Sequence, residues 1–205
     1  MAFLAVSSLA DLGLWRLALE SVVVSVFLWR FSRGILRELR VRAPVYTLLL
    51  GAAVFLIWIA PDTLVPGYRA HWLFENPITG KAASSLSDSV LSSPLGLGLR
   101  SFRAIVLVPI AEELFWRGWL MRWIIDADFR MIELGAFSAR AFWITALLFA
   151  SEHGSYWDVG LAAGILYNWW MVREKSLGDC ILAHAVTNAA LSALVMAFGK
   201  WQYWM

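Results

Sequence analysis

Residues 43–60 read APVYTLLLGAAVFLIWIA, an apolar stretch without a single charged side chain. A helix needs about 20 consecutive apolar residues to cross the hydrocarbon core of a bilayer, with ~17 as the lower bound. The stretch meets that requirement. We therefore predict a transmembrane helix here, and the rest of the chain is interpreted outward from it.

The composition of the whole chain also indicates a lipid environment. Apolar residues make up 60% of the 205 residues and charged residues 16%, whereas soluble domains have about 45–50% and 25%. The 13 tryptophans agree, because Trp gathers at membrane–water interfaces. A net charge of +2 argues against a nucleic-acid partner, and the single cysteine, Cys180, excludes an internal disulfide. We expect an integral membrane protein whose surroundings are the lipid bilayer.

Five further stretches are candidate spans, which gives about six membrane helices in one domain over residues 1–205. The first is weakened by Arg16 and Glu20, and the short fourth would have to start earlier or lie tilted. The five stretches are residues 14–29, 99–125, 141–153, 157–172 and 177–198. The sequence thus predicts an all-α fold, a polytopic membrane helix bundle.

The connecting segments suggest how the bundle is oriented. Five arginines within residues 30–42 mark that segment as cytoplasmic, because short cytoplasmic loops are rich in Lys and Arg. Alternation then places residues 61–98 outside, and residues 122–140 and 173–179 inside. The segment 61–98 is rich in Ser, Pro and Gly, and we expect a short surface helix within residues 81–91.

Ionisable side chains at membrane depth are costly, so each one is a candidate functional residue. Residues 108–120 read VPIAEELFWRGWL, in which Glu113 and Arg117 are four residues apart and can pair on one helix face. Glu112 projects about 100° away from that face. A structural ion pair would explain Glu113 and Arg117 but leaves Glu112 uncompensated, which favours acid–base chemistry.

Two more polar groups lie on later predicted helices. FASEH places Phe149 and His153 one turn apart, and HAVTN does the same for His184 and Asn188. Taken alone, His153 is interpreted as a residue at a helix end. His184 and Asn188 either form an interhelical hydrogen-bond pair or serve as donors to a developing oxyanion.

The remaining polar and small residues are given structural interpretations. In GILYNWWMV, Tyr167 and Asn168 stand beside two tryptophans and are interpreted as part of an interfacial belt. Gly160 and Gly164 predict a close-packed helix face, and Glu152 is expected to face the membrane boundary.

The order E-E-x-x-x-R, F-x-x-x-H and H-x-x-x-N on successive hydrophobic helices resembles the CPBP family of intramembrane proteases. That family includes the Rce1-type CAAX prenyl endopeptidases and bacterial relatives described as abortive-infection or immunity proteins. The aromatic-rich sequence around the motifs is similar to that of a bacterial branch of the family, which is linked to exosortase sorting. The matching core covers about residues 99–198, and seven residues fall on family positions: Glu112, Glu113, Arg117, Phe149, His153, His184 and Asn188.

The resemblance implies an intramembrane endopeptidase with six to eight transmembrane helices. It would cleave near the C-terminus of a membrane-tethered protein or peptide, in the inner membrane if the source is bacterial. Glu112 and His153 would activate a water, and His184 and Asn188 would stabilise the oxyanion. Glu113, itself a candidate catalytic residue, would orient the site together with the structural residues.

The structural residues implied by the resemblance are Arg117, which pairs with Glu113, and Phe149, which forms a wall near the scissile bond. No cofactor is favoured. Zinc is the alternative, with Glu112, Glu113, His153 and His184 as ligands of a metalloprotease.

Two non-proteolytic functions compete with the peptidase hypothesis. Buried Glu and His side chains could relay protons in a coupled transporter, although broken helices and inverted repeats are not evident in the sequence. A non-catalytic, immunity-type membrane protein would be favoured by loss of a motif residue, but the full set is present.

Overall fold

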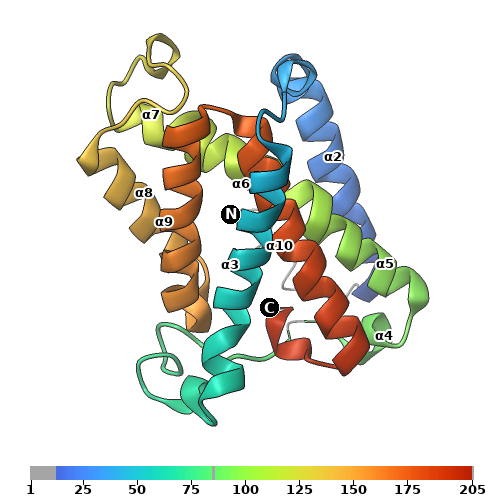
Figure 1. Cartoon of the computed structure of the whole chain (residues 1–205). Helices are drawn as coiled ribbons and strands as arrows, with labels where there is room; N and C mark the ends of the chain where they lie inside the picture. The colour runs from blue at the N-terminus through green and yellow to red at the C-terminus, as the bar shows by residue number, and fades with distance from the viewer. Residues whose placement is uncertain (1–12, 85, 205) are drawn as a thin grey trace.

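The computed structural model describes residues 13–84 and 86–204, which form a bundle of helices (Figure 1). Within these residues there is no β-strand, only an isolated bridge between Asn76 and Gly80. The predicted all-α fold is therefore confirmed. Its α-helices are α2 (Gly13–Glu38), α3 (Pro44–Leu64), α4 (Asp88–Leu91), α5 (Pro94–Phe102), α6 (Val108–Glu113), α7 (Met121–Trp123), α8 (Ala139–Ser151), α9 (Trp157–Glu174) and α10 (Leu177–Phe198).

Short helical segments connect or interrupt these elements. Two are π-helical, η2 (Arg103–Leu107) and η3 (Leu114–Leu120). The others are 3₁₀ turns: η1 (Tyr68–Ala70), η4 (Phe129–Met131), η5 (Gly154–Tyr156) and η6 (Trp201–Tyr203).

A single long rod, residues 94–123, carries the two adjacent glutamates. It consists of α5, η2, α6, η3 and α7 in unbroken succession. The Ser93 hydroxyl accepts from the backbone N–H of Gly96 and caps the start of the rod, with Pro94 at the first helical position. Pro109 cannot donate a backbone hydrogen bond, which accounts for the widened π-turn directly before α6.

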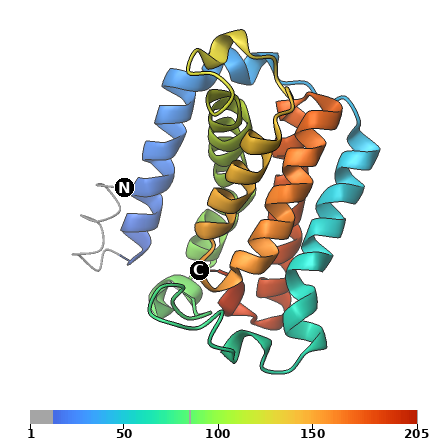
Figure 2. The same cartoon turned by 90° about the vertical axis from the view of Figure 1, so that its left-hand side faces the viewer.

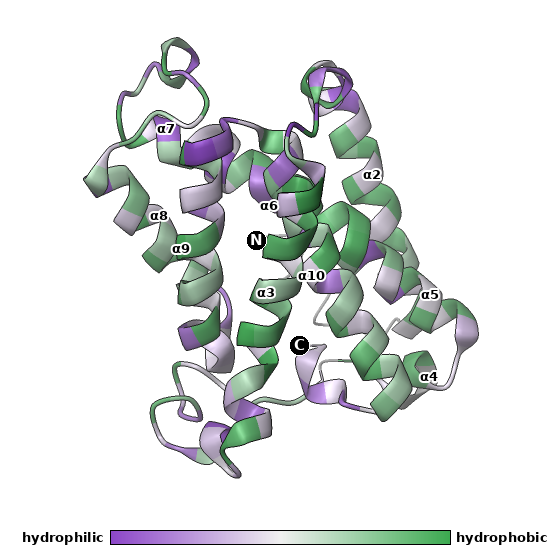
Figure 3. Ribbon diagram, in the orientation of Figure 1, coloured by the Kyte–Doolittle hydropathy of each residue, from purple (hydrophilic) through white to green (hydrophobic). Residues whose placement is uncertain are grey.

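The helices pack in pairs around the centre of the bundle. α3 lies along α10, and α8 lies along α9. Helix α2 packs against α5, α4 and η2, and it stands at the edge of the bundle in the turned view (Figure 2). Hydrophobic residues follow the helices, while hydrophilic residues concentrate towards the end loops (Figure 3).

Three helices among the described residues are long and apolar enough to cross a membrane: Pro44–Leu64, Pro94–Trp123 and Leu177–Phe198. They correspond to the predicted second, third and sixth spans. Helix α8 is apolar but has only 13 residues. The expected count of six to eight transmembrane helices is not confirmed.

Two predictions about local structure were wrong. The first helix does not end near residue 29 but continues to Glu38, because residues 30–38 include strong helix formers and no proline. Its arginines up to Arg37 therefore lie on a helix. The connector predicted over residues 61–98 is shorter, because α3 continues through Pro61 to Leu64 and α5 begins at Pro94. The short helix expected within it is present as Asp88–Leu91. The serines around that segment favour turns, since their hydroxyls compete for backbone groups.

The hydrophobic core surrounds the polar residues of interest. Its buried members come from α3, η3, α8, α9 and α10 and include Val54, Trp116, Phe149, Tyr167 and Met171. The same helices that provide the apolar packing thus also carry the candidate site.

Candidate active site

Glu113 and Arg117 form an ion pair at the centre of the bundle. Arg117 Nη1 lies 3.0 Å from Glu113 Oε1, and neither side chain has any exposed surface. The predicted pairing over four residues is confirmed. Two charges removed from water need further hydrogen bonds to be tolerated, and the neighbouring helices supply them.

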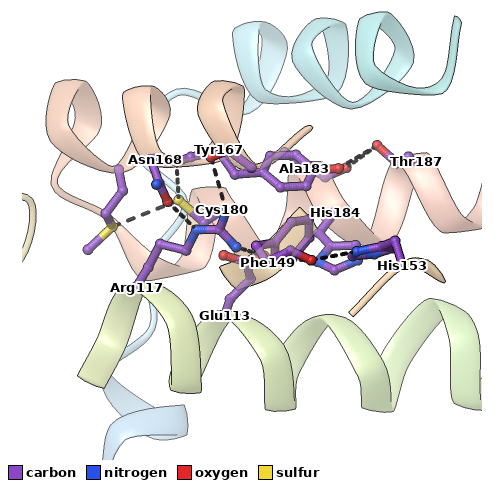
Figure 4. A network of polar contacts seen from close by, with 12 residues as sticks. Glu113, Arg117, Phe149, His153, Tyr167, Asn168, Cys180, Ala183, His184 and Thr187 are labelled. Atoms are coloured by element: carbon purple, nitrogen blue, oxygen red, sulfur yellow. Dashed lines mark hydrogen bonds and ion pairs between the residues drawn. The ribbon is translucent and has the colours of Figure 1, made fainter. Parts of the chain in front are cut away.

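Helix α9 provides those additional partners for Arg117. Nε donates to Asn168 Oδ1 at 2.9 Å, and Nη2 donates to the carbonyl oxygen of Gly164 at 3.2 Å. The guanidinium carbon also lies 4.7 Å from the centre of the Phe149 ring. Figure 4 shows side chains from three separate helices converging on this guanidinium–carboxylate pair.

Glu113 also connects the pair to α10. His184 Nδ1 lies 2.9 Å from the same Oε1 atom that Arg117 contacts. With Nδ1 donating to the carboxylate, Nε2 is the ring nitrogen left for other partners. Tyr167 stacks on the imidazole with ring centres 5.3 Å apart, and this fixes the orientation of the ring.

His153 is held at the end of α8 by its own preceding turn. Its Nδ1 lies 2.7 Å from the backbone carbonyl oxygen of Phe149. Because a carbonyl only accepts, Nδ1 carries the hydrogen and Nε2 holds a lone pair. The Phe149 ring packs against the imidazole, with centres 4.6 Å apart, and Trp58 approaches it edge-on at 5.2 Å.

One cavity of about 570 Å³ connects the three predicted motifs. Its walls include the side chains Glu112, His153, His184 and Asn188, with Phe149 among the apolar ones. Glu112 is half-buried and faces the cavity, whereas Glu113 and Arg117 lie behind its wall. The two adjacent glutamates therefore occupy different surroundings, as their angular separation on the helix predicts.

Asn188 contacts the rod that carries the glutamates. Its Nδ2 donates to the carbonyl oxygen of Ala104 in η2 at 2.8 Å, which leaves the second N–H of that amide for another partner. His184 and Asn188 are thus not bonded to each other but stand one turn apart on the same wall.

Sequence reasoning misplaced two residues of this site, Tyr167 and Asn168. Tyr167 and Asn168, interpreted as an interfacial belt, are 1% and 0% exposed. Besides contacting Arg117, Asn168 donates to the Phe142 carbonyl, and Tyr167 donates to the Thr187 hydroxyl. Glu152, expected at the membrane boundary, is exposed at the end of α8 and also lines the cavity. The position of its amide side chain within an apolar helix could have identified Asn168 as a candidate site residue.

The small residues of α9 serve packing, as the G-x-x-x-G pattern predicts. A Cβ atom on Gly164 would lie 3.2 Å from Phe149 Cδ1, and one on Gly160 would lie 3.1 Å from the His153 ring. Both glycines let α9 approach the residues that hold the candidate site.

A zinc ion would need Glu112, Glu113, His153 and His184 as its ligands. Across the part of the chain that the structure describes, no three His, Cys, Asp or Glu side chains form a group that could hold a metal ion. One oxygen of Glu113 is already shared by Arg117 and His184. As arranged, these side chains do not fit a zinc site.

Comparison with known proteins gives one finding. Residues 94–190 match the sequence model of the family described as type II CAAX prenyl endopeptidase Rce1-like. The comparisons with curated proteins and with solved structures found no match. The matched segment runs from the first turn of α5 into α10 and contains all seven residues of the predicted motifs. The segment covers somewhat less than half of the chain, and over it the protein is similar to the Rce1-like family of CAAX prenyl endopeptidases, as the motifs predict.

Proposed function

We propose that this protein is an intramembrane endopeptidase that hydrolyses a peptide bond near the C-terminus of a membrane-associated protein. The observation that carries the proposal is the shared cavity, which is lined by Glu112 on α6, His153 in the turn after α8, and His184 and Asn188 on α10. The similarity of residues 94–190 to the Rce1-like family supports the class of reaction.

In the proposed reaction, Glu112 and His153 Nε2 hold a water and Glu112 takes its proton. The water oxygen bonds to the scissile carbonyl carbon, and negative charge moves to the carbonyl oxygen. His184 and Asn188 donate hydrogen bonds to that oxyanion. The C–N bond then breaks, and the proton passes from Glu112 to the leaving nitrogen, which yields a carboxylic acid and an amine.

The buried charges behind the wall support a positioning role for Glu113 and Arg117. Glu113 holds His184 through Nδ1, so Nε2 is directed away from the ion pair and can donate to the substrate when it is protonated. Arg117 in turn fixes Glu113 from the opposite side. No cofactor takes part in this scheme.

A glutamate-to-glutamine exchange tests the proposal. Glu112→Gln keeps the size of the side chain but removes the base, so we expect kcat to fall by about 10²–10⁴-fold. The assay uses purified protein in detergent and a mass-spectrometric readout of C-terminal fragments released from lipid-anchored peptides. Glu133→Gln, on an exposed loop, is the matched control and should keep full activity. Equal turnover by the Glu112→Gln and wild-type proteins would refute the proposal.

Metal dependence is tested in the same assay. If Glu112 acts as the base without a metal, wild-type activity should persist after prolonged incubation with EDTA or 1,10-phenanthroline. Loss of activity that added zinc restores would instead support the metalloprotease alternative.

A further inference from the structure

A groove separates the second half of α2 from the rod. The buried residues of α2, which are Leu17, Glu20 and Ser21, all lie in its first third, and none of residues 22–38 is buried. A hollow of about 350 Å³ lies between this part of α2 and the segments η2 and α6 of the rod. The second half of α2 therefore runs beside the rod without packing tightly against it.

The lining of the groove is apolar over most of its length. Leu28 and Leu36 line it from α2, and Leu107 and Ile110 line it from the rod. Because α2 stands at the edge of the bundle (Figure 2), the groove adjoins the surrounding lipid. Hydrocarbon fills such a space in a bilayer, since an empty one would forfeit the dispersion contacts along its walls. The apolar walls therefore suit an acyl chain.

Two arginines stand at the end of the groove that lies towards the C-terminus of α2. Arg33 and Arg37 both line it and are one helical turn apart, so their guanidinium groups can reach a common anion. Neither forms an ion pair within the part of the chain that the structure describes. Glu38 is the only acidic residue within residues 21–42, and it does not line the groove. This end of the groove is therefore complementary in charge to an anion.

The length of the groove matches one leaflet of a bilayer. Ser25 lines its inner end, and Arg33 and Arg37 lie about 12 and 18 Å further along α2. Half of the hydrocarbon core of a bilayer is about 15 Å thick. The Trp29 ring, 64% exposed, lies 5.7 Å from the Arg33 guanidinium carbon, and Trp is common at the membrane interface. The two guanidinium groups thus lie at the level of the headgroups when Leu28 lies among the acyl chains.

We propose that this groove binds one anionic phospholipid, with an acyl chain along its apolar walls and the headgroup phosphate between Arg33 and Arg37. Guanidinium groups bind phosphate oxygens through paired hydrogen bonds. Residues 30–42 are expected on the cytoplasmic side, where the leaflet is rich in anionic lipid. A lipid in the groove holds α2 against the rod, and the first third of α2 supplies Leu17 and Glu20 to the wall of the candidate active-site cavity. The lipid site does not depend on the proposed peptidase function.

Lipid titration followed by native mass spectrometry tests the site. The probes are dioleoyl phosphatidylglycerol and dioleoyl phosphatidylcholine, each added to purified full-length protein in detergent. The first phosphatidylglycerol molecule should bind at least about tenfold more tightly than the first phosphatidylcholine molecule. The Arg33→Gln/Arg37→Gln protein should lose most of this preference. Leu28→Trp, which fills the groove and keeps both arginines, should weaken the binding of the first phosphatidylglycerol molecule several-fold.

Arg130→Gln/Arg173→Gln is the matched control. It removes two exposed arginines that do not line the groove, and it should keep the full preference. If the Arg33→Gln/Arg37→Gln protein does not fold, judged by circular dichroism and gel filtration, Leu28→Trp decides the question. Equal binding of the two lipids by the wild-type protein, unchanged binding in the groove variants, or an equal loss in the control would overturn the inference. A dimer without bound lipid as the main species would also overturn it, because a second copy of the chain would then occupy the groove.

Thermal unfolding gives a second readout in the same detergent. Phosphatidylglycerol should raise the unfolding midpoint of the wild-type protein by a few degrees relative to phosphatidylcholine, because a ligand that binds only the folded state stabilises it. The rise should be absent in the Arg33→Gln/Arg37→Gln protein and present in the Arg130→Gln/Arg173→Gln control. Equal midpoints of the wild-type protein in the two lipids would contradict a site that holds α2 against the rod.

Discussion

Arg117 combines several interactions that depend on one another. Its guanidinium is fully buried, contacts Glu113 and Asn168, and packs over the Phe149 ring. Removing one partner of a buried ion pair is much more destabilising than replacing both, because the remaining charge has no compensation. Stability measurements at this residue therefore distinguish an essential pair from an incidental contact.

We expect Arg117→Met to lower the free energy of unfolding by about 3–5 kcal/mol, because it leaves the Glu113 carboxylate buried and uncompensated. Thermal or SDS-induced unfolding of the protein in detergent would measure the change. The double variant Glu113→Gln/Arg117→Met should recover part of the loss, and Arg130→Met, at an exposed position, should cost little. An Arg117→Met protein as stable as the wild type would show that the ion pair does not contribute to the stability of the fold.

At the scale of elements, the connector between α3 and α4 clamps the turn that carries His153. Arg69 in η1 is 9% exposed and donates to the Ser155 carbonyl at 2.8 Å. It also pairs with Asp62 and with Asp158 at the start of α9. Trp157 Nε1 reaches back to the carbonyl oxygen of Leu73 at 3.0 Å. The connector therefore holds both sides of the turn η5.

Tyr68 adds to this clamp through its hydroxyl. The hydroxyl donates to Asp158 Oδ2 at 3.1 Å. Desolvation, followed by the negative charge of Asp158, raises the pKa of Tyr68 above its ordinary value. The group therefore stays protonated, and the contact with Asp158 persists throughout the neutral range.

We expect Arg69→Leu to loosen this turn and, through it, His153. Amide hydrogen exchange across residues 153–158 should accelerate by at least about tenfold, corresponding to ~1.4 kcal/mol of local stability. In the peptidase assay, kcat should fall while KM changes little, because the substrate-binding walls remain. Lys81→Leu is the control on the same connector, since Lys81 forms only an exposed pair with Glu75. Unchanged exchange and kcat would contradict the clamp.

Features that depend on neighbouring residues could be predicted from the sequence, whereas features that depend on contacts between distant segments could not. The span 177–198 was predicted with the bounds that α10 has, because apolar length is a local property. The pairing of Glu113 with Arg117 was equally local. Asn168 was misinterpreted because its partner, Arg117, lies 51 residues away, and only the packing of α9 against η3 reveals the contact.

The sequence also left the end of α2 and the role of the long connector unpredicted. Residues 30–38 continue α2 because nothing in that stretch breaks a helix, although the basic residues suggested a loop. Residues 61–81 were predicted only as a connector, and their role became visible once Arg69 was placed beside Asp158. The motifs of candidate catalytic residues were therefore easier to predict than the segments that position them.

At the scale of the whole molecule, the basic segments gather at one end of the bundle. The Arg42 guanidinium donates to the Glu174 carbonyl at 3.3 Å, and the Ser176 hydroxyl donates to the Arg40 carbonyl at 2.7 Å. The Arg140 side chain reaches the Ile124 carbonyl at 2.6 Å. These loops form the upper end in Figure 1, and the described connector residues, 65–84 and 86–93, lie at the opposite end.

Because short cytoplasmic loops are rich in Lys and Arg, we expect the basic end to face the cytoplasm and the connector to face the other side of the membrane. Met131→Cys and Ile78→Cys probe the two ends, since these side chains are 79% and 96% exposed. A membrane-impermeant maleimide should label the Met131→Cys protein only in inside-out vesicles and the Ile78→Cys protein only in right-side-out vesicles. The wild-type protein, whose single cysteine is buried, should stay unlabelled. Labelling of both variants from one side would mean that the bundle does not cross the bilayer in this direction, and an exchanged pattern would place the Arg69 clamp in the cytoplasm.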